Sequence, residues 1–325
     1  MRRLPVSRCA ALFAAAALGM AGPAASAPAA RSAGTPVADH HQYLYSPAAA
    51  AFMSSHASLR PVSAQDLIPQ LDAAGIARAA VLSVAWVYGA PSHAHDDEYL
   101  RVRAENDWAA RQAAEFPERL VALCSVDPLK DYALAELARC AASPEFGRAI
   151  KLHPDARGIR LDDPAEIDRV QRVFRSANAR GMAIVLQLRG TGAQQARLLI
   201  EQLLPHAPDV PVQVAYAAAA GGQDTPPLAA LSVLADAAAR QDPRMRQVWF
   251  DVSSFARPGL SRADARQLVR RLRQVGMGRV LYGSDTVVGL DGERAPRDAW
   301  AAFRSLPLTD AEAARVANNV MSYLR

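Results

Sequence analysis

Residues 79–87 read Ala-Ala-Val-Leu-Ser-Val-Ala-Trp-Val, an apolar run that only Ser83 interrupts. A run of this kind predicts a strand buried on both faces, as in a parallel sheet. Helical periodicity precedes it over residues 63–74, which end before Gly75, and follows it over about residues 99–116. The strand therefore lies between two helices, as it does in a unit of an α/β fold.

The same alternation continues to the end of the chain. Further strands, each followed by a helix, are predicted over residues 120–126, 148–153, 183–188, 212–216, 248–252 and 279–284. A short first strand over residues 38–44 brings the number to eight, which closes as a (β/α)8 TIM barrel. We expect one barrel domain over residues 37–325. An open doubly wound sheet is the alternative, but no Gly-x-Gly-x-x-Gly segment follows the first strand.

Residues 1–30 differ in character from the rest. Three arginines precede an apolar run over residues 9–20, and a stretch rich in Ala, Pro and Ser follows it. This order predicts a secretory signal peptide, with residues 31–36 as a linker. The run is shorter than the ~20 apolar residues of a stable membrane helix. We therefore expect a periplasmic or secreted protein without stable membrane insertion after cleavage.

Charge and cysteine content restrict the class of protein. The three arginines of the predicted signal supply more than half of the net charge of +5, and no basic block interleaved with aromatic residues remains. Nucleic acid is therefore not an expected partner; a small molecule is, and a homo-oligomer is left open. Cys124 and Cys140 do not make a disulfide framework. We interpret Cys124 as a small buried apolar residue, with a bridge to Cys140 as the alternative.

Polar side chains end several of the predicted strands, where the active sites of such barrels lie. The first strand carries Asp39, His41 and Tyr43 on one face, because side chains alternate along a strand. Other strand ends supply Lys151, His153, Gln187, Arg189, Tyr216 and Asp285. Burying such groups without partners would cost roughly a few kcal/mol each. They are therefore expected to line a polar site.

Four of these segments resemble a known family. Asp-His-His-Gln-Tyr (39–43), Ile-Lys-Leu-His-Pro (150–154), Val-Gln-Val-Ala-Tyr (212–216) and Leu-Tyr-Gly-Ser-Asp (281–285) look like the strand ends of amidohydrolase-related, metal-dependent hydrolases of the amidohydrolase superfamily. The resemblance implies a barrel that holds one divalent metal, usually zinc. It also implies hydrolysis of amides or lactones, or decarboxylation of small aromatic and unsaturated acids.

Only part of the family's ligand set is retained. The resemblance places its two first-strand histidines on His41 and Tyr43, its other two histidines on Gln187 and Tyr216, and its aspartate on Asp285. A phenol has a pKa of about 10 and must ionise to bind a metal, and an amide oxygen suits harder ions than zinc. The expected cofactor is thus a divalent metal, zinc if any, held by His41 and Asp285, or no metal at all.

Three functions remain open. In the first, the protein is a hydrolase or lyase whose Asp285 activates a water, with His153 as a second catalytic group. Its small anionic or cyclic substrate would be bound by Asp39, Tyr43, Lys151, Gln187, Arg189 and Tyr216. In the second, the barrel has lost its metal and turns over, or only binds, a small molecule in the periplasm. In the third, it is a non-catalytic binding or scaffold protein.

Overall fold

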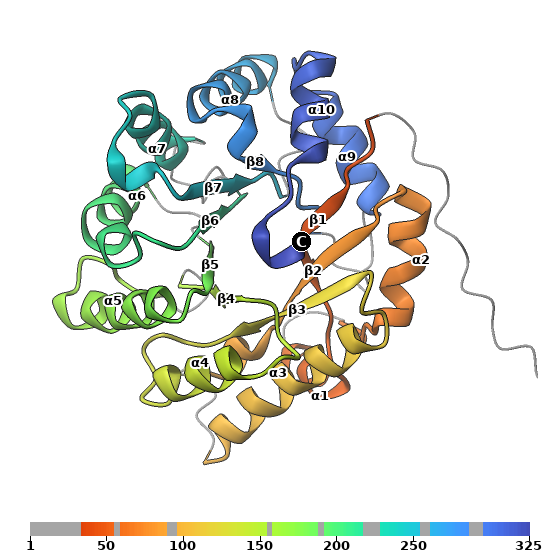
Figure 1. The fold of residues 1–325 in the computed structure, drawn as a ribbon, viewed down its shortest axis with the longest axis vertical. Coiled ribbons are helices and arrows are strands. Elements are labelled where there is room, and N and C mark those ends of the chain that lie inside the picture. Colours follow the sequence, from red (N-terminus) through yellow and green to blue (C-terminus); the bar gives the residue numbers. More distant parts are fainter. Residues whose placement is uncertain are drawn as a thin grey trace, which may run out of the picture.

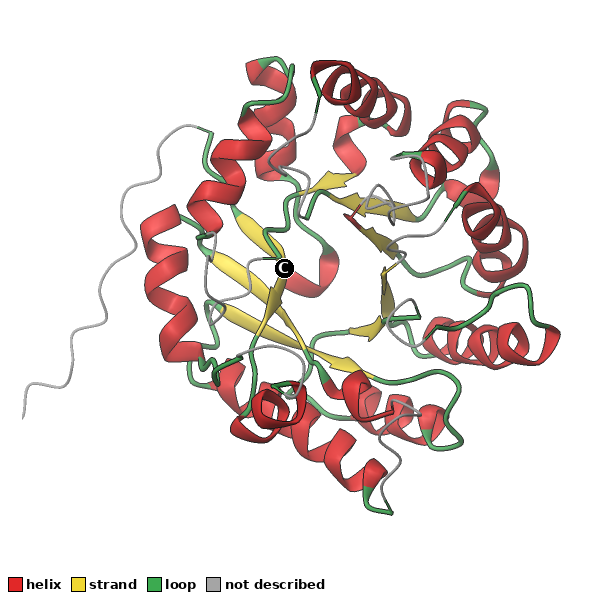
Figure 2. Cartoon of the chain, turned by 180° about the vertical axis from the view of Figure 1, so that it is seen from behind, coloured by secondary structure: helices red, strands yellow, loops and turns green. Residues whose placement is uncertain are grey.

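The structure is a computed structural model that describes residues 34–54, 59–89, 96–154, 158–187, 192–216, 228–253, 261–285 and 295–325. Eight parallel strands form one sheet in the order β1 to β8. They stand in a ring with the helices around it (Figures 1 and 2). The predicted (β/α)8 barrel is confirmed, whereas the predicted signal peptide over residues 1–30 lies outside the described residues.

The strands are short and almost entirely buried. They are β1 Ala38–Tyr43, β2 Arg78–Leu82, β3 Leu120–Ser125, β4 Ala149–Leu152, β5 Ala183–Gln187, β6 Val212–Ala215, β7 Val248–Asp251 and β8 Val280–Leu281. The ring closes where His40 N–H donates to Tyr282 O and Asp285 N–H donates to His41 O, both at 2.9 Å. This closure brings the end of β1 beside the segment that follows β8.

The ten helices of the described residues are α1 Pro47–Met53, α2 Ala64–Ala74, α3 Glu98–Ala114, α4 Ala133–Ala142, α5 Pro164–Ala179, α6 Ala193–Leu198, α7 Ala229–Ala239, α8 Arg262–Val275, α9 Pro296–Arg304 and α10 Asp310–Asn318. Local sequence sets their ends, as α2 shows. The Ser63 hydroxyl and the Asp66 carboxylate form a capping box, and Gly75 ends the helix with a φ of 68°. Among the described residues, no helix has both the length and the apolar character that a membrane crossing requires.

The structure corrects two details of the predicted elements. The strand expected over residues 79–87 ends at Leu82, because the Ser83 hydroxyl accepts a hydrogen bond from Ala85 N–H (3.2 Å) and starts the 3-10 helix η1, Ala85–Gly89. The helix predicted to follow the strand over residues 183–188 begins at Ala193 and remains α-helical only to Leu198. It continues as a π-helical turn, Leu199–Leu203, and a 3-10 turn that contains Pro205.

The chain ends inside the ring of strands (Figure 1). The last 3-10 helix, η9, spans Ser322–Leu324. Just before it, Met321 N–H donates to His40 Nε2 at 3.2 Å, and the Tyr323 hydroxyl donates to Gln213 Oε1. His40 and Gln213 lie in the first halves of β1 and β6, so the segment packs into the amino-terminal half of the barrel. A site for a ligand is therefore expected at the other end.

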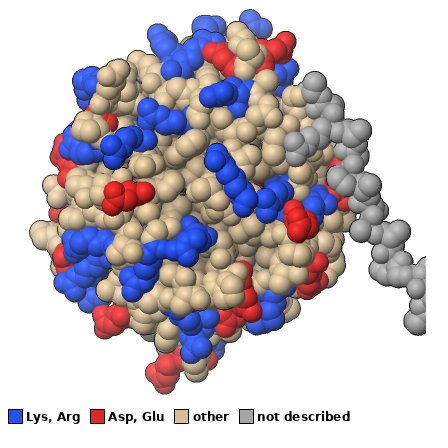
Figure 3. Space-filling view, in the orientation of Figure 1, with Lys and Arg blue, Asp and Glu red and all other residues tan. Residues whose placement is uncertain are grey.

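The visible surface carries charges of both signs. On the face of Figure 1, Lys and Arg side chains are scattered with Asp and Glu side chains between them (Figure 3). Ion pairs at the surface of the described residues include Arg273 with Glu312 at 2.6 Å. Such pairs contribute roughly 0–1 kcal/mol each, so the fold depends mainly on its buried core.

Candidate active site

The first strand brings two of the predicted site residues together. The Tyr43 hydroxyl lies 3.1 Å from His41 Nε2. Asp39 is placed differently, since the pairing register shifts between Asp39 and Gln42. Its carboxylate accepts hydrogen bonds from Gln42 Nε2 (2.9 Å) and from the backbone N–H groups of His41 and Ser284 (both 3.0 Å). Asp39 thus joins β1 to the segment after β8, and its substrate-binding role stays a prediction.

Asp251, the last residue of β7, binds the other nitrogen of His41. The distance from His41 Nδ1 to Asp251 Oδ2 is 3.1 Å, and both side chains are fully buried. Burial would raise the pKa of Asp251, but the charge and hydrogen bond of His41 and hydrogen bonds from Ser253 and Gln213 hold that pKa below its usual value. An ionised carboxylate only accepts hydrogen bonds. His41 Nδ1 therefore carries a proton, and Nε2 faces the site.

A glycine lets β1, β7 and β8 meet this closely. A Cβ atom at Gly283 would lie 2.7 Å from Ser253 Oγ and 2.8 Å from His41 Cβ, closer than real Cβ contacts. Sequence reasoning missed Asp251, although the signal is present. It is a carboxylate that ends the apolar strand Val-Trp-Phe-Asp, the same pattern that pointed to Gln187.

Lys151, Gln187 and Tyr43 form the opposite side of the site. The Lys151 ammonium donates to Gln187 Oε1 at 2.8 Å and lies 5.7 Å from the centre of the Tyr43 ring. The Tyr43 hydroxyl donates to Gln187 Oε1 at 3.3 Å. Burial raises the pKa of Tyr43 well above its usual value, so Tyr43 is a neutral phenol. When His41 Nε2 is protonated, the Tyr43 hydroxyl can accept from it and donate to Gln187.

Tyr216 and Asp285 form the third part of the site. The Tyr216 hydroxyl donates to Asp285 Oδ2 at 2.5 Å, and Asp285 Oδ1 lies 3.6 Å from His41 Nε2. Both residues have a left-handed backbone, with φ of 57° for Tyr216 and 47° for Asp285. That conformation costs a non-glycine residue roughly 1–3 kcal/mol. It is retained where Tyr216 N–H donates to Asp251 Oδ1 and Asp285 N–H donates to His41 O, both at 2.9 Å.

Two predicted site residues are not placed beside Asp285. His153 packs its ring against Trp86 of η1, with ring centres 4.1 Å apart and planes tilted by 37°. Its catalytic role stays a prediction. Arg189 lies outside the described residues, in the segment 188–191, as do residues 217–227, 254–260 and 286–294. The described part of the site therefore consists of the residues at the carboxyl ends of the strands, which form the floor of the barrel mouth.

The residues around His41 do not fit the metal site that the resemblance implies. A catalytic zinc takes about three protein ligands drawn from His, Cys, Asp and Glu. Here Asp285 is the carboxylate nearest to His41 Nε2, Tyr43 stays a neutral phenol, and Gln187 Oε1 already accepts from a lysine ammonium. A buried cation one hydrogen bond from a ligand position opposes a second cation there.

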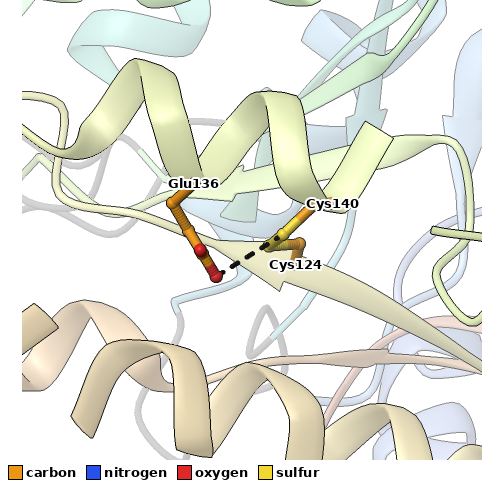
Figure 4. Close-up of side chains that lie close together, drawn as sticks. All are labelled: Cys124, Glu136 and Cys140. Atoms are coloured by element: carbon orange, nitrogen blue, oxygen red, sulfur yellow. Dashed lines mark hydrogen bonds between the residues drawn. A yellow bond between two sulfur atoms is a disulfide. The ribbon is translucent and has the colours of Figure 1, made fainter. Parts of the chain in front are cut away.

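Elsewhere in the described residues, only Cys124, Glu136 and Cys140 bring three possible ligands within 4.8 Å of one another. The two cysteines form a disulfide between β3 and α4, with Cα atoms 6.2 Å apart, and Cys140 Sγ lies 3.7 Å from Glu136 Oε1 (Figure 4). The interpretation of Cys124 as an unbridged apolar residue is therefore wrong. Disulfide sulfurs are not thiolates, so this cluster is not a metal site.

Comparisons with known proteins agree with this architecture. The sequence model of the amidohydrolase family matches residues 39–319. No curated protein sequence matches the chain significantly. Among solved structures, 5-carboxyvanillate decarboxylase from Sphingomonas paucimobilis superimposes with a TM-score of 0.59 at 14% identity, covering 87% of this chain and 97% of that one.

Two further structures are similar. A probable 2-pyrone-4,6-dicarboxylic acid hydrolase from Acinetobacter baumannii, with citric acid bound, has a TM-score of 0.60 at 18% identity and covers 87% of this chain and 96% of its own. A dihydroxybenzoic acid decarboxylase from Polaromonas sp. JS666, with bound manganese and an inhibitor, has a TM-score of 0.57 at 13% identity, with 87% and 94% covered. At these identities the likeness supports the fold.

Proposed function

The chain belongs to the amidohydrolase family, and from that premise we propose that it is an enzyme that hydrolyses a small, anionic organic substrate with Asp285 as the general base. One observation carries the proposal. Asp285 and Tyr216 hold strained backbone conformations and are hydrogen-bonded to each other beside His41. Strain of this kind persists where the surrounding structure enforces it, and it gathers at functional sites.

Asp285 is the group that an entering molecule meets. Its side chain is 11% exposed, whereas the side chain of His41 is 0% exposed. Tyr216 holds Asp285 Oδ2, so Oδ1 is the oxygen directed toward His41. A carboxylate in this position can take a proton from a water molecule.

The reaction then follows from these groups. Asp285 accepts a proton from water while the water oxygen bonds to the carbonyl carbon of an ester, lactone or amide. The bond from that carbon to the leaving oxygen or nitrogen breaks, and the proton passes from Asp285 to the leaving atom. His41, with Nδ1 on Asp251, carries positive charge at Nε2 when protonated and stabilises the ionised Asp285.

The anionic substrate class is argued from Lys151. Its ammonium is fully buried in the floor of the barrel, on Gln187 and near the ring of Tyr43. A buried cation favours a negatively charged ligand. The solved structures of similar fold include enzymes named for carboxylic acids, one with citric acid bound, which supports this choice. Arg189, close in sequence to the end of β5, is proposed as a second basic group.

We propose that catalysis here proceeds without the metal of other family members. Manganese is bound in the decarboxylase from Polaromonas, but at the five positions where the resemblance places the family's ligands this chain retains only His41 and Asp285. Asp285 is moreover hydrogen-bonded to Tyr216, and Gln187 to Lys151. These contacts build an acid–base site.

We propose further that the protein is exported, with residues 1–30 removed. The disulfide between Cys124 and Cys140 supports this, because disulfides persist mainly in oxidising compartments. Cell fractionation and the mass of the purified protein test it. A full-length chain in the cytoplasm would contradict it.

A substrate screen with a matched variant tests the hydrolytic function. Lactones, esters and amides of small carboxylic acids are compared with their uncharged analogues, with metal-depleted wild-type protein and with Asp285→Asn. We expect turnover of a charged member, retained after metal removal and lost in Asp285→Asn. Thermal stabilisation by the same compounds without turnover would instead favour the binding function, and carbon dioxide release would assign a lyase.

A further inference from the structure

Asp251 is held by groups from both ends of the barrel. Toward the mouth it accepts from His41 Nδ1 (3.1 Å) and Tyr216 N–H (2.9 Å), and from the Ser253 hydroxyl (2.6 Å). Toward the amino-terminal end, Gln213 Nε2 donates to Asp251 Oδ2 at 2.7 Å. Asp251 and Gln213 are both 0% exposed. Gln213 therefore connects Asp251 to the residue that holds the Gln213 side-chain amide in place.

The C-terminal segment holds that amide. The Tyr323 hydroxyl is hydrogen-bonded to Gln213 Oε1, while Gln213 Nε2 also points at His40 O, 3.4 Å away. His40 O and the ionised Asp251 can only accept, so the NH2 group of Gln213 must face them and its oxygen must face Tyr323. Burial raises the pKa of Tyr323 well above its usual value, so its hydroxyl keeps the proton that it donates.

The hydrogen bonds thus have one direction along the whole series, from Tyr323 to Gln213 to Asp251, where the series meets the donor His41 Nδ1–H. Each of these four side chains is at least nine-tenths buried. No water needs to complete the series, and reversing Gln213 would set its oxygen against a carboxylate. Buried polar series that are fully paired fix one arrangement of their members.

We propose that Tyr323 and Gln213 are positioning residues that hold the Asp251 carboxylate against His41 Nδ1–H, so that the C-terminal segment keeps His41 Nε2 turned toward the active site. The inference rests on the proposed function only for its effect on the rate. It concerns His41 whether or not the substrate is known. Tyr323 contacts no reacting group and acts through Gln213 and Asp251.

Three variants test the proposal. Gln213→Met keeps the length of the side chain but removes its hydrogen bonds to Tyr323, Asp251 and His40 O, and Tyr323→Phe removes only the terminal hydroxyl. Tyr88→Phe is the matched control, because Tyr88 is a buried tyrosine too and its hydroxyl is hydrogen-bonded to Ser46, outside the series. The first readout is the ¹⁵N spectrum of histidine-labelled full-length protein, with the His41 signals identified from a His41→Asn variant.

In the wild type we expect one His41 tautomer with the proton on Nδ1. Gln213→Met should free the Asp251 carboxylate to turn away from His41 Nδ1, and so shift both His41 nitrogen signals toward a tautomer mixture. It should also lower kcat about tenfold at unchanged KM, since one hydrogen bond of ~1.4 kcal/mol corresponds to that factor. Tyr323→Phe should do the same to a smaller extent, about threefold on the same scale. Tyr88→Phe should leave the His41 signals and kcat unchanged.

If the His41 signals of Gln213→Met and Tyr323→Phe match those of Tyr88→Phe, the proposal is overturned, whatever the enzyme does. The spectrum needs no substrate, so this result is separate from the fate of the proposed function. The proposed function would fail separately if Asp285→Asn kept the turnover of the wild type, or if no substrate were turned over at all. In either case the His41 signals could still respond to Gln213→Met.

Discussion

His40 and His41 are adjacent in the sequence and belong to opposite ends of the barrel. His40 has backbone partners on both nitrogens, with Nδ1 on Tyr282 O at 2.8 Å and Nε2 accepting from Met321 N–H. His41 has side-chain partners, Asp251 on one nitrogen and Tyr43 on the other. Backbone partners anchor the chain, whereas titratable partners make a reactive group.

The electrostatics of the two residues differ accordingly. Burial lowers the pKa of His40 to about 4, because the low-dielectric interior disfavours its charged form, and its hydrogen bond to Tyr282 O opposes this only in part. His41 instead has the ionised carboxylate of Asp251 3.1 Å from its Nδ1. Identical side chains one residue apart thus serve as a structural anchor and as a part of the active site, and only their partners distinguish them.

The largest expected effect is on kcat and concerns Asp285, at the mouth of the barrel. Asp285→Asn should lower kcat for a turned-over substrate by about 10²–10⁴, the usual contribution of a general base, because an amide cannot accept the proton of water. Steady-state kinetics measure it. Asp298→Asn, at an exposed carboxylate, is the control. Equal rates in Asp285→Asn and wild type would remove Asp285 from the mechanism.

The next effect is on stability and concerns Asp251, which connects the mouth of the barrel to its amino-terminal end. Asp251→Ala should destabilise the fold by about 3–5 kcal/mol, since it leaves buried hydrogen-bond donors without their acceptor. These donors include His41 Nδ1–H and Gln213 Nε2. Urea unfolding followed by circular dichroism gives the change. A loss below ~1 kcal/mol, the size of a single hydrogen bond, would show that Asp251 does not join the two ends.

A third prediction concerns the barrel wall, away from both histidines. Cys124→Ala with Cys140→Ala should cost about 3 kcal/mol, because the bridge closes a loop of sequence separation 16 and restricts the unfolded chain. The activity of the folded protein should not change. Thermal unfolding with and without a phosphine reductant measures the same difference in the wild type. Reduced and oxidised proteins that unfold together would contradict it.

A fourth prediction concerns the pH dependence of stability that His40 contributes. The pKa of His40 lies below that of an unfolded histidine, so the unfolded state takes up more protons between pH 6.5 and about 4. Stability should fall as pH decreases through that window, by up to ~1.4 kcal/mol per unit from this residue.

The variant His40→Gln should lack this component and give a flatter curve over the same window. The difference between the two urea curves isolates it, since burial raises the pKa of Asp39 and that residue acts in the opposite sense. Parallel curves would show that His40 is not held neutral.

Much of the fold could be predicted because its signals are local. Apolar runs and helix caps such as Ser63 mark the units, and the number of units implies the barrel. The site was predictable only to the level of strand ends. The role of Asp39 depends on a register shift, and the importance of Asp251 depends on a close approach through Gly283, neither of which appears in residue spacing. The Cys124–Cys140 bridge likewise required the packing of α4 against β3.

The placement of the last residues has a consequence for the order in which the protein matures. Tyr323 follows all eight strands in the sequence, and its hydroxyl orients Gln213, whose Nε2 also points at His40 O in the first strand. A nascent chain can therefore build its eight strands before it possesses the group that orients Gln213. The contact between Tyr323 and Gln213 can in this sense form only after all eight strands have been made.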